Sequence, residues 1–278
     1  MKRDVADRIA PMNVLYKFFS LDCFLEAAVQ SGCKTIELWG GAPHVDIEGA
    51  APSDVRRVKR QIEGRGLSVS CFTPEISLYP VNIASDEEHV RLRSESYVTK
   101  SLEIAVELGA PVMQISSGTG YRHMPPDEAW RRSAESLGRI ARRAESLGIQ
   151  LALEPLPQYE SNLVCDVAGI ERMLDEIGSP AVGVLLDTVV AAAAGDDPDI
   201  YFRKFGKRVL HAQWIDGPEG HLAWGDGRLP LERFWNAVRE ADYSGSFGLE
   251  LYDHKYYVEP GPVLRRCVET MRGLESFA

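Results

Sequence analysis

The sequence predicts an α/β protein with the TIM-barrel fold, and three observations support this prediction. The chain has 278 residues, a length that suits one barrel of eight β–α units. Eight short apolar runs alternate with helical patterns along its whole length. Within the runs, apolar and polar residues do not alternate, which is typical of parallel strands buried on both faces. We therefore expect a single barrel domain over residues 1–278.

The eight expected strands cover residues 9–15, 35–39, 67–72, 111–115, 150–154, 182–187, 209–215 and 246–251. Acidic residues favour the first turn of a helix, and glycine favours its C-terminal cap. These signals predict one helix from Asp127 to Gly148 and another from Asp86 to Gly109. A third helix is expected to open at Ser53. A doubly wound open sheet is the alternative fold, but the GxGxxG fingerprint that usually follows its first strand is absent.

Composition excludes several classes of function. The formal net charge is -10, and an acidic protein repels phosphate backbones, which argues against a nucleic-acid partner. No window approaches the roughly 18 uninterrupted apolar residues of a membrane helix, so no membrane partner is expected. The five cysteines show no CxxC spacing, which suggests free thiols in a reducing compartment. The N-terminal stretch has no apolar secretory region, so we expect a cytoplasmic protein.

Potential metal ligands occur at the ends of four consecutive expected strands. Glu154 and Asp187 close the fifth and sixth strands, His211 lies within the seventh, and Glu250 lies in the eighth. They are 33, 24 and 39 positions apart, about one β–α unit each. The carboxyl ends of the strands carry the active site of a TIM barrel, and a lone buried carboxylate is costly unless it is paired or binds a metal.

This set of three carboxylates and one imidazole suits Mn²⁺, Co²⁺ or Mg²⁺ better than a structural zinc ion. Each residue also has a structural alternative. A strand-end acid can be solvated or part of an ion pair, and His211 alone would more often be a hydrogen-bonded core histidine. The case for a metal site depends on the four residues occurring in consecutive strands.

Other candidates for the pocket come from loops and from other strand ends. Glu37, in the second expected strand, has a salt bridge in the barrel mouth and a catalytic role as equal alternatives. The glycine-rich loop over residues 217–229, which contains His221, is either a lid or a set of turns. The candidates for substrate contact, each with a core or surface role as its alternative, are Trp39, His44, Tyr79, Glu160 and Asp216.

With these residues in view, the sequence resembles the sugar-phosphate isomerase/epimerase family, the xylose-isomerase-like TIM barrels that include ketose 3-epimerases. The resemblance covers the full chain. The family's metal ligands map onto Glu154 in "LEPL", Asp187 in "LLDT", His211 in "LHAQWID" and Glu250 in "LELYD". The stretches "IELWGGAPH", "TPEISLYPVN" and "EPLPQYESNLVCD" are most similar to the fructoselysine 3-epimerase branch.

The resemblance implies one divalent metal ion, with Mn²⁺ or Co²⁺ favoured and Mg²⁺ or Zn²⁺ as alternatives. It also implies a small sugar substrate and a homodimer or homotetramer. The metal would act as a Lewis acid while Glu154 and Glu250 move a proton between the two faces of the carbon beside the ketone, through an ene-diolate. His44 and Glu160 would orient hydroxyl groups.

One departure and several alternatives remain. Many ketose 3-epimerases carry a histidine three residues after the aspartate of the sixth strand, where this chain has Val190. A plain tagatose or psicose epimerase is therefore less favoured than a ketosamine epimerase, although it stays an alternative. The others are an aldose–ketose isomerase, a hydroxypyruvate isomerase, an inosose dehydratase, an endonuclease IV-like hydrolase and a non-catalytic sugar-binding barrel.

Overall fold

The structure is a computed structural model and describes residues 4–76 and 81–274. Its centre is a sheet of parallel strands in the order β1-β8-β7-β6-β5-β4-β3-β2, and a bridge between Met12 and Glu37 brings its two edges together. The prediction of a TIM barrel is thereby confirmed. The strands are β1 (Ile9–Pro11), β2 (Thr35–Gly40), β3 (Ser68–Pro74), β4 (Val112–Ser116), β5 (Gln150–Glu154), β6 (Val182–Asp187), β7 (Val209–Gln213) and β8 (Phe247–Leu249).

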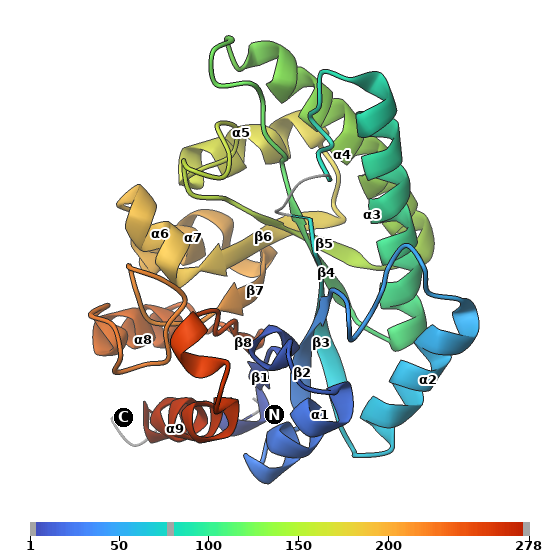
Figure 1. Cartoon of the computed structure of the whole chain (residues 1–278). Helices are drawn as coiled ribbons and strands as arrows, with labels where there is room; N and C mark the ends of the chain where they lie inside the picture. Colours follow the sequence, from blue (N-terminus) through green and yellow to red (C-terminus); the bar gives the residue numbers. More distant parts are fainter. Residues whose placement is uncertain (1–3, 77–80, 275–278) are drawn as a thin grey trace.

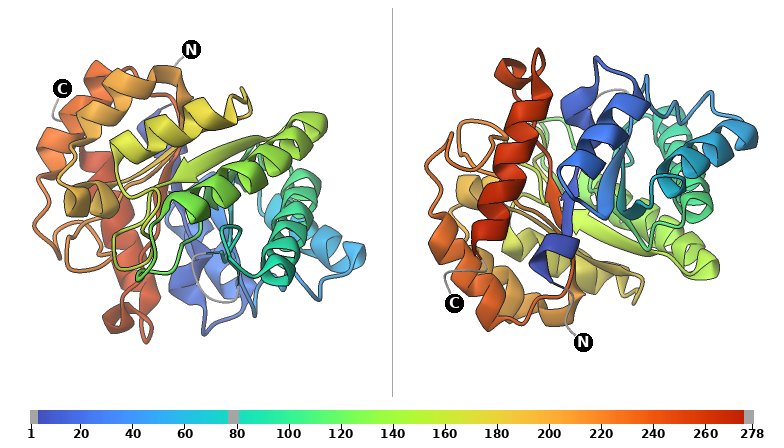
Figure 2. Two further views of the ribbon diagram at one scale, coloured as in Figure 1. Left: turned by 90° about the horizontal axis from the view of Figure 1, so that it is seen from above. Right: turned by 90° about the horizontal axis from the view of Figure 1, so that it is seen from below.

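Helices surround these strands on the outside, as Figures 1 and 2 show. The α-helices are α1 (Leu21–Gln30), α2 (Pro52–Glu63), α3 (Glu88–Leu108), α4 (Asp127–Leu147), α5 (Val167–Ile177), α6 (Thr188–Ala194), α7 (Pro198–Phe205), α8 (Leu231–Glu240) and α9 (Pro260–Gly273). Short 3-10 helices add η1 (Val5–Asp7), η2 (Asn13–Tyr16), η3 (Gly206–Arg208) and η4 (His254–Tyr256). No helix among the described residues is long and apolar enough to cross a membrane.

The helix boundaries follow the signals in the sequence. Gly109 and Gly148 cap α3 and α4 with positive φ angles of 77° and 70°, a conformation that glycine adopts without a steric penalty. The third expected helix begins one residue before Ser53, where the Asp54 carboxylate accepts a hydrogen bond from the backbone N–H of Ala51. The helix expected from Asp86 begins two residues later, at Glu88.

The first strand is shorter than expected. The apolar run over residues 9–15 predicted one strand, but β1 ends at Pro11 and η2 begins at Asn13. The side chain of Asn13 accepts a hydrogen bond from the N–H of Trp39 and donates one to the carbonyl of Trp39. The Asn13 side chain therefore makes the hydrogen bonds to Trp39 of β2 that a strand backbone would otherwise make. The backbone of residues 13–16 does not have to continue the strand and forms a helical turn.

Two apolar regions hold the barrel together. A large cluster packs the outer faces of the strands against the helices, and a small one fills the barrel interior with Cys71, Val112, Ala152 and Leu185. The cysteines Cys23, Cys33, Cys71, Cys165 and Cys267 are free thiols. Polar side chains at the carboxyl ends of the strands lie beyond the interior cluster and form the site described next.

Candidate active site

A cavity of about 540 Å³ lies at the carboxyl ends of the strands. Its lining includes Gln114 from β4, Glu154 at the end of β5, and Glu250, which follows β8 directly. Loops that follow the strands complete the walls. They contribute Glu75, Tyr159, Glu160, His221 and Tyr252.

Three of the four predicted metal ligands gather at this cavity. Oxygen and nitrogen atoms of Asp187, His221 and Glu250 all lie within 4.8 Å of one another. His221 Nδ1 lies 3.2 Å from Glu250 Oε2 without the alignment of a hydrogen bond. Glu154 lies close enough for the charges of Glu250 and Asp187 to raise its pKa. The side-chain amide of Gln114 donates a hydrogen bond to Glu154 and orients its carboxylate.

The electrostatics of the site show an excess of buried negative charge. Burial is the largest cause that raises the pKa of Glu154 and of Asp187, and burial raises the pKa of Glu250 to about 7. Burial lowers the pKa of His221, but the charges of Glu250, Asp187 and Glu154 outweigh it and raise this pKa to about 10. One imidazole thus faces three carboxylates, and a bound cation would relieve their repulsion.

The residues present fit a divalent cation. Asp187 Oδ1 accepts hydrogen bonds from the backbone N–H groups of Val189 and Val190 and caps α6, whereas Asp187 Oδ2 has no partner although the residue is fully buried. Gln114 Oε1 and Gln213 Oε1 are also buried without a partner. Buried polar atoms in proteins almost always have a hydrogen-bond partner or another ligand. A cluster of carboxylate and amide oxygens is the donor set that binds Mn²⁺ or Mg²⁺.

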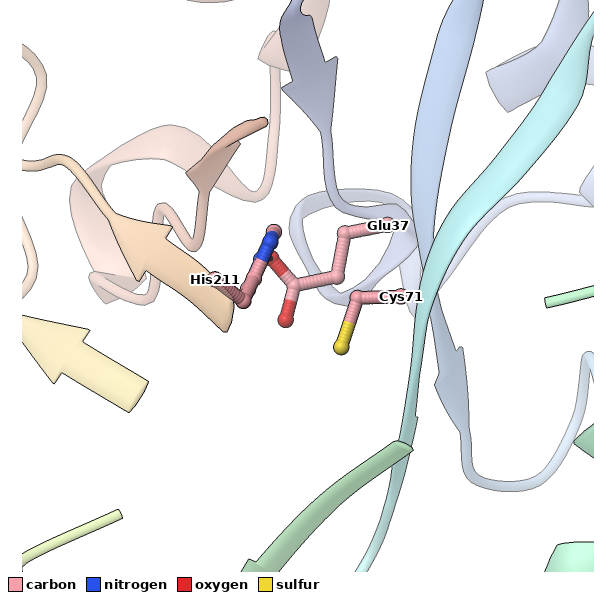
Figure 3. A group of neighbouring side chains, drawn as sticks. All are labelled: Glu37, Cys71 and His211. Carbon is pink, nitrogen blue, oxygen red and sulfur yellow. Dashed lines mark hydrogen bonds and ion pairs between the residues drawn. The ribbon is translucent and has the colours of Figure 1, made fainter. Parts of the chain in front are cut away.

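His211 lies apart from these carboxylates. Its Nε2 is 2.9 Å from Glu37 Oε2, and the two residues point toward each other inside the barrel, next to Cys71 (Figure 3). Glu37 Oε1 also accepts hydrogen bonds from Thr73, at 2.6 Å, and from Gln213, at 3.1 Å. Glu37 is thus held by side chains of β3 and β7 inside the barrel, which favours the structural alternative for this residue.

The substrate-contact candidates divide into two groups. Trp39 and Glu160 line the cavity, and Trp39 Nε1 donates a hydrogen bond to Glu75. His44 does not line it, because its two ring nitrogens bind Asn13 and the carbonyl of Phe19, and burial lowers its pKa. Tyr79 lies outside the described residues.

Asp216 also lies outside the cavity lining and anchors the glycine-rich loop instead. It is 2% exposed. Its two carboxylate oxygens accept hydrogen bonds from the backbone N–H groups of Gly217, Gly225, Gly227 and Leu229. The loop over residues 217–229 is thus tied to the end of β7, and a backbone bridge from His221 to Tyr252 holds its middle.

Sequence reasoning missed several residues of the site. His221 was noted only as part of a possible lid, and Gln114, Gln213 and Glu75 were not identified as site residues. A signal existed for the two glutamines, because each interrupts an apolar strand with a polar side chain, in "PVMQIS" and in "VLHAQW". For His221 the spacing along the chain carried no such signal, since its position depends on the folding of the loop.

An acidic cluster at the mouth of a TIM barrel is typical of enzymes whose active site lies at the carboxyl ends of the strands. Comparisons with known proteins agree with this class. A family model described as xylose isomerase-like TIM barrel matches residues 25–274. The fructoselysine 3-epimerase of Escherichia coli O157:H7 is 29% identical over 250 residues, which are 89% of this chain and 90% of that protein. The ketose 3-epimerase of Arthrobacter globiformis is 24% identical over 80% of this chain and 75% of that protein.

Solved structures show the same fold. The D-psicose 3-epimerase of Clostridium cellulolyticum H10, solved with D-tagatose, aligns with a TM-score of 0.79 at 16% identity, over 96% of this chain and 99% of that chain. The chain belongs to the xylose isomerase-like TIM barrel family. It is an enzyme of the isomerase and epimerase class.

Proposed function

We propose that this enzyme is a 3-epimerase of a ketose or of a ketose–amine adduct such as fructoselysine, and that it depends on a divalent cation. The observation that carries the proposal is that Glu154 and Glu250 line one cavity from strands separated by β6 and β7. Epimerisation requires one group that removes a proton from the substrate carbon and a second that returns a proton to the opposite face. Two carboxylates that line one cavity from different strands can supply these two groups.

In the proposed mechanism these two carboxylates carry the proton. One of Glu154 and Glu250 takes it from C3, and the other donates one to the opposite face of that carbon. Gln114 orients Glu154 through its amide, so the carboxylate keeps its direction during the reaction. Trp39, Tyr159 and Leu156 line the cavity and reduce the access of water to the reacting carbon.

The cation would be held by Glu154, Asp187 and Glu250, with the His221 imidazole within 4.8 Å of the last two. When bound, a divalent cation supplies Lewis-acid stabilisation for negative charge on substrate oxygens. The sequence predicts His211 as a further ligand, but its Nε2 is engaged by Glu37. Glu160, which lines the cavity, is proposed to orient substrate hydroxyl groups.

A second cavity supports an amino-acid adduct as the substrate. It has a volume of about 350 Å³ and shares Trp39, Glu75 and Tyr252 with the first cavity. Its other lining residues include Lys17, whose ammonium lies 4.5 Å from the ring centre of Tyr252. Asp46 adds a carboxylate. A wall with one ammonium and carboxylates of the opposite sign suits an amino-acid group, which carries both charges at neutral pH.

The experiment follows deuterium in the substrate. The purified protein is incubated with Mn²⁺ in D₂O, and NMR detects exchange in fructose, psicose, tagatose, fructoselysine and a fructosamine made from butylamine. We expect deuterium at C3 together with a new C3 epimer, and a lower KM for fructoselysine than for the butylamine adduct, which lacks the amino-acid charges. Glu154→Gln and Glu250→Gln should abolish exchange, whereas Glu171→Gln, which alters an ion pair with Lys204 on the outer helices, should not.

Other outcomes would contradict the proposal. Deuterium at C1 or C2 with an aldose product would identify an aldose–ketose isomerase. The absence of exchange in every ketose and ketosamine would mean that the family fold is present without this reaction. Full activity in the presence of excess chelator would contradict the dependence on a divalent cation, but it would be consistent with proton transfer by the two carboxylates.

Three further predictions from the sequence also belong to the proposal. We expect one barrel domain, a homodimer or homotetramer, and a location in the cytoplasm, where free thiols persist. Sedimentation equilibrium of the purified chain measures its oligomeric state, and a monomer at micromolar concentration would contradict the second of these.

A further inference from the structure

The seventh strand offers two polar residues to the site, and they lie at different depths in the barrel. In the pairing of β6 with β7, Asp187 lies opposite Gln213, whereas His211 lies opposite Leu185. Two residues along a strand correspond to about 6.6 Å. Oxygen or nitrogen ligands of one cation lie about 2.0–2.6 Å from it. The backbone of His211 therefore lies two strand positions deeper in the barrel than that of a residue directly beside Asp187.

Gln213 has an unused oxygen at the level of Asp187. The residue is fully buried, and its Oε1 has no partner, as is also true of Asp187 Oδ2. Its Nε2 donates to Glu37 Oε1 at 3.1 Å. Because a carboxylate only accepts hydrogen bonds, this contact requires the NH₂ group to face Glu37, and the carbonyl oxygen is turned away from it. A buried carbonyl oxygen left without a partner destabilises the folded state, so this atom is available to a ligand.

His211 is already engaged. Its Nε2 lies 2.9 Å from Glu37 Oε2, and both residues are almost completely inaccessible to solvent. Gly248 of β8 provides the space for this pair, since a Cβ atom there would lie 1.8 Å from Glu37 Oε2 and 2.8 Å from His211 Nε2. For His211 Nε2 to bind the cation at the level of Asp187, its pairing with Glu37 would have to break and leave Glu37 buried without it.

We propose that Gln213, through Oε1, is the ligand that β7 contributes to the divalent cation, beside Asp187 Oδ2. The inference rests on the proposed function, because it requires the cation held by Glu154, Asp187 and Glu250. In this arrangement His211 is a positioning residue that holds Glu37, and Glu37 in turn orients the Gln213 amide. A neutral amide oxygen in place of an imidazole favours hard cations such as Mn²⁺ and Mg²⁺ over Zn²⁺.

X-ray absorption of the cobalt-loaded protein tests this assignment, because its scattering pattern counts imidazole ligands without reference to activity. We expect the same imidazole count in wild type and in His211→Gln, and one imidazole more in Gln213→His. The Mn²⁺ dissociation constant, measured by calorimetry, should rise at least tenfold in Gln213→Met, which keeps the length of the side chain and removes its oxygen. Circular dichroism checks that each variant is folded.

The outcomes separate this inference from the proposed function. A loss of one imidazole in His211→Gln would show that His211 is the ligand and would overturn the inference while the cation site stands. An unchanged count in a folded, cobalt-loaded Gln213→His would also overturn it. A wild-type protein that binds neither Co²⁺ nor Mn²⁺ would overturn the cation of the proposed function and this inference together.

Discussion

At the scale of single residues, this protein uses buried carboxylates for two different purposes. Asp187 uses one oxygen to cap α6 and leaves the other without a partner, so it retains the capacity to bind. Asp216 uses both oxygens for backbone N–H groups and retains none. The hydrogen bonds that an acid already accepts therefore separate a candidate ligand from a structural anchor.

This difference gives a prediction for Asp216. In Asp216→Asn one oxygen becomes an NH₂ group, which faces two backbone N–H donors and leaves them unsatisfied. We expect the free energy of unfolding to fall by about 2–4 kcal/mol, measured by urea denaturation. The matched control is Asp166→Asn, because Asp166 caps α5 through one bond to Gly169, and asparagine caps a helix equally well. Equal losses in the two variants would contradict the anchoring role of Asp216.

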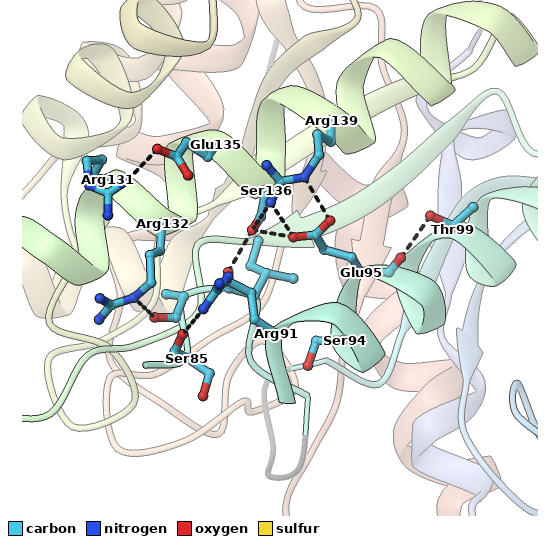
Figure 4. Close-up of polar contacts among 12 residues, drawn as sticks. Ser85, Arg91, Ser94, Glu95, Thr99, Arg131, Arg132, Glu135, Ser136 and Arg139 are labelled. Atoms are coloured by element: carbon cyan, nitrogen blue, oxygen red, sulfur yellow. Dashed lines mark hydrogen bonds and ion pairs between the residues drawn. The ribbon is translucent and has the colours of Figure 1, made fainter. Parts of the chain in front are cut away.

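At the scale of elements, ion pairs between neighbouring helices fasten the outer layer of the barrel. Figure 4 shows the contact of α3 with α4, in which Arg139 donates hydrogen bonds to both oxygens of Glu95 and Ser136 donates a third. The hydrogen bond from Arg139 is the largest cause that lowers the pKa of Glu95, against the opposing effect of burial. Arg131 and Glu135 form a pair within α4 that is more exposed.

The lowered pKa of Glu95 predicts how stability depends on pH. The unfolded chain takes up a proton near pH 4.5, whereas the folded protein does so at a lower pH, so the stabilisation is complete above 4.5 and is lost as the pH falls through the folded pKa. Glu95→Gln should therefore lower the free energy of unfolding at pH 7 by about 0.5–1 kcal/mol, after allowance for solvent screening, and the difference from wild type should shrink below pH 4.

The control for this prediction lies on the neighbouring helix α4. Glu135→Gln removes the partner of Arg131 in the exposed pair, and we expect a smaller change in unfolding at pH 7. Chemical denaturation at a series of pH values measures both variants. A Glu95→Gln variant whose deficit persists undiminished at acid pH would show that packing, and not charge, accounts for its loss.

At the scale of the whole molecule, closure of the barrel brings side chains from distant strands into one interior. Glu37 of β2 contacts Thr73 of β3 and both His211 and Gln213 of β7, and these residues are separated by up to 176 positions in the chain. Gly248 of β8 leaves the space in which they meet. The interior of this barrel therefore contains a polar network under the cavity, and no two neighbouring strands form it alone.

Gly248→Ala tests this arrangement. Because a Cβ atom would overlap Glu37 and approach His211, we expect the free energy of unfolding to fall by about 1–3 kcal/mol, measured by guanidinium denaturation. Gly138→Ala is the control, since the nearest atom to its Cβ in α4 would be Arg142 Nη1 at 3.8 Å. Alanine is favoured over glycine within a helix, so this variant should be as stable as wild type or more so. An unchanged free energy of unfolding in Gly248→Ala would contradict the close packing of Gly248 against Glu37 and His211.

Much of the architecture followed from the sequence. Runs of apolar residues predicted the strands, and glycines such as Gly109 and Gly148 predicted where helices end. These features are local, because burial on both faces and positive φ angles act on the residues themselves. The first strand was shorter than expected, because its length depends on Asn13, whose side chain binds Trp39 of the neighbouring strand. The seventh and eighth strands also end earlier than expected, at Gln213 and Leu249.

The sequence by itself determined the barrel and the meeting of Glu154, Asp187 and Glu250, because the carboxyl ends of parallel strands must converge. Only the tertiary structure decided which residue of β7 lies beside them. Side chains two residues apart on a strand share a face, so His211 and Gln213 are equivalent in the sequence pattern. A register shift between Val184 and Leu185 places Gln213 opposite Asp187, and Glu37 engages His211 below. Strand register and contacts across the barrel are set by packing between distant segments, which local patterns do not record.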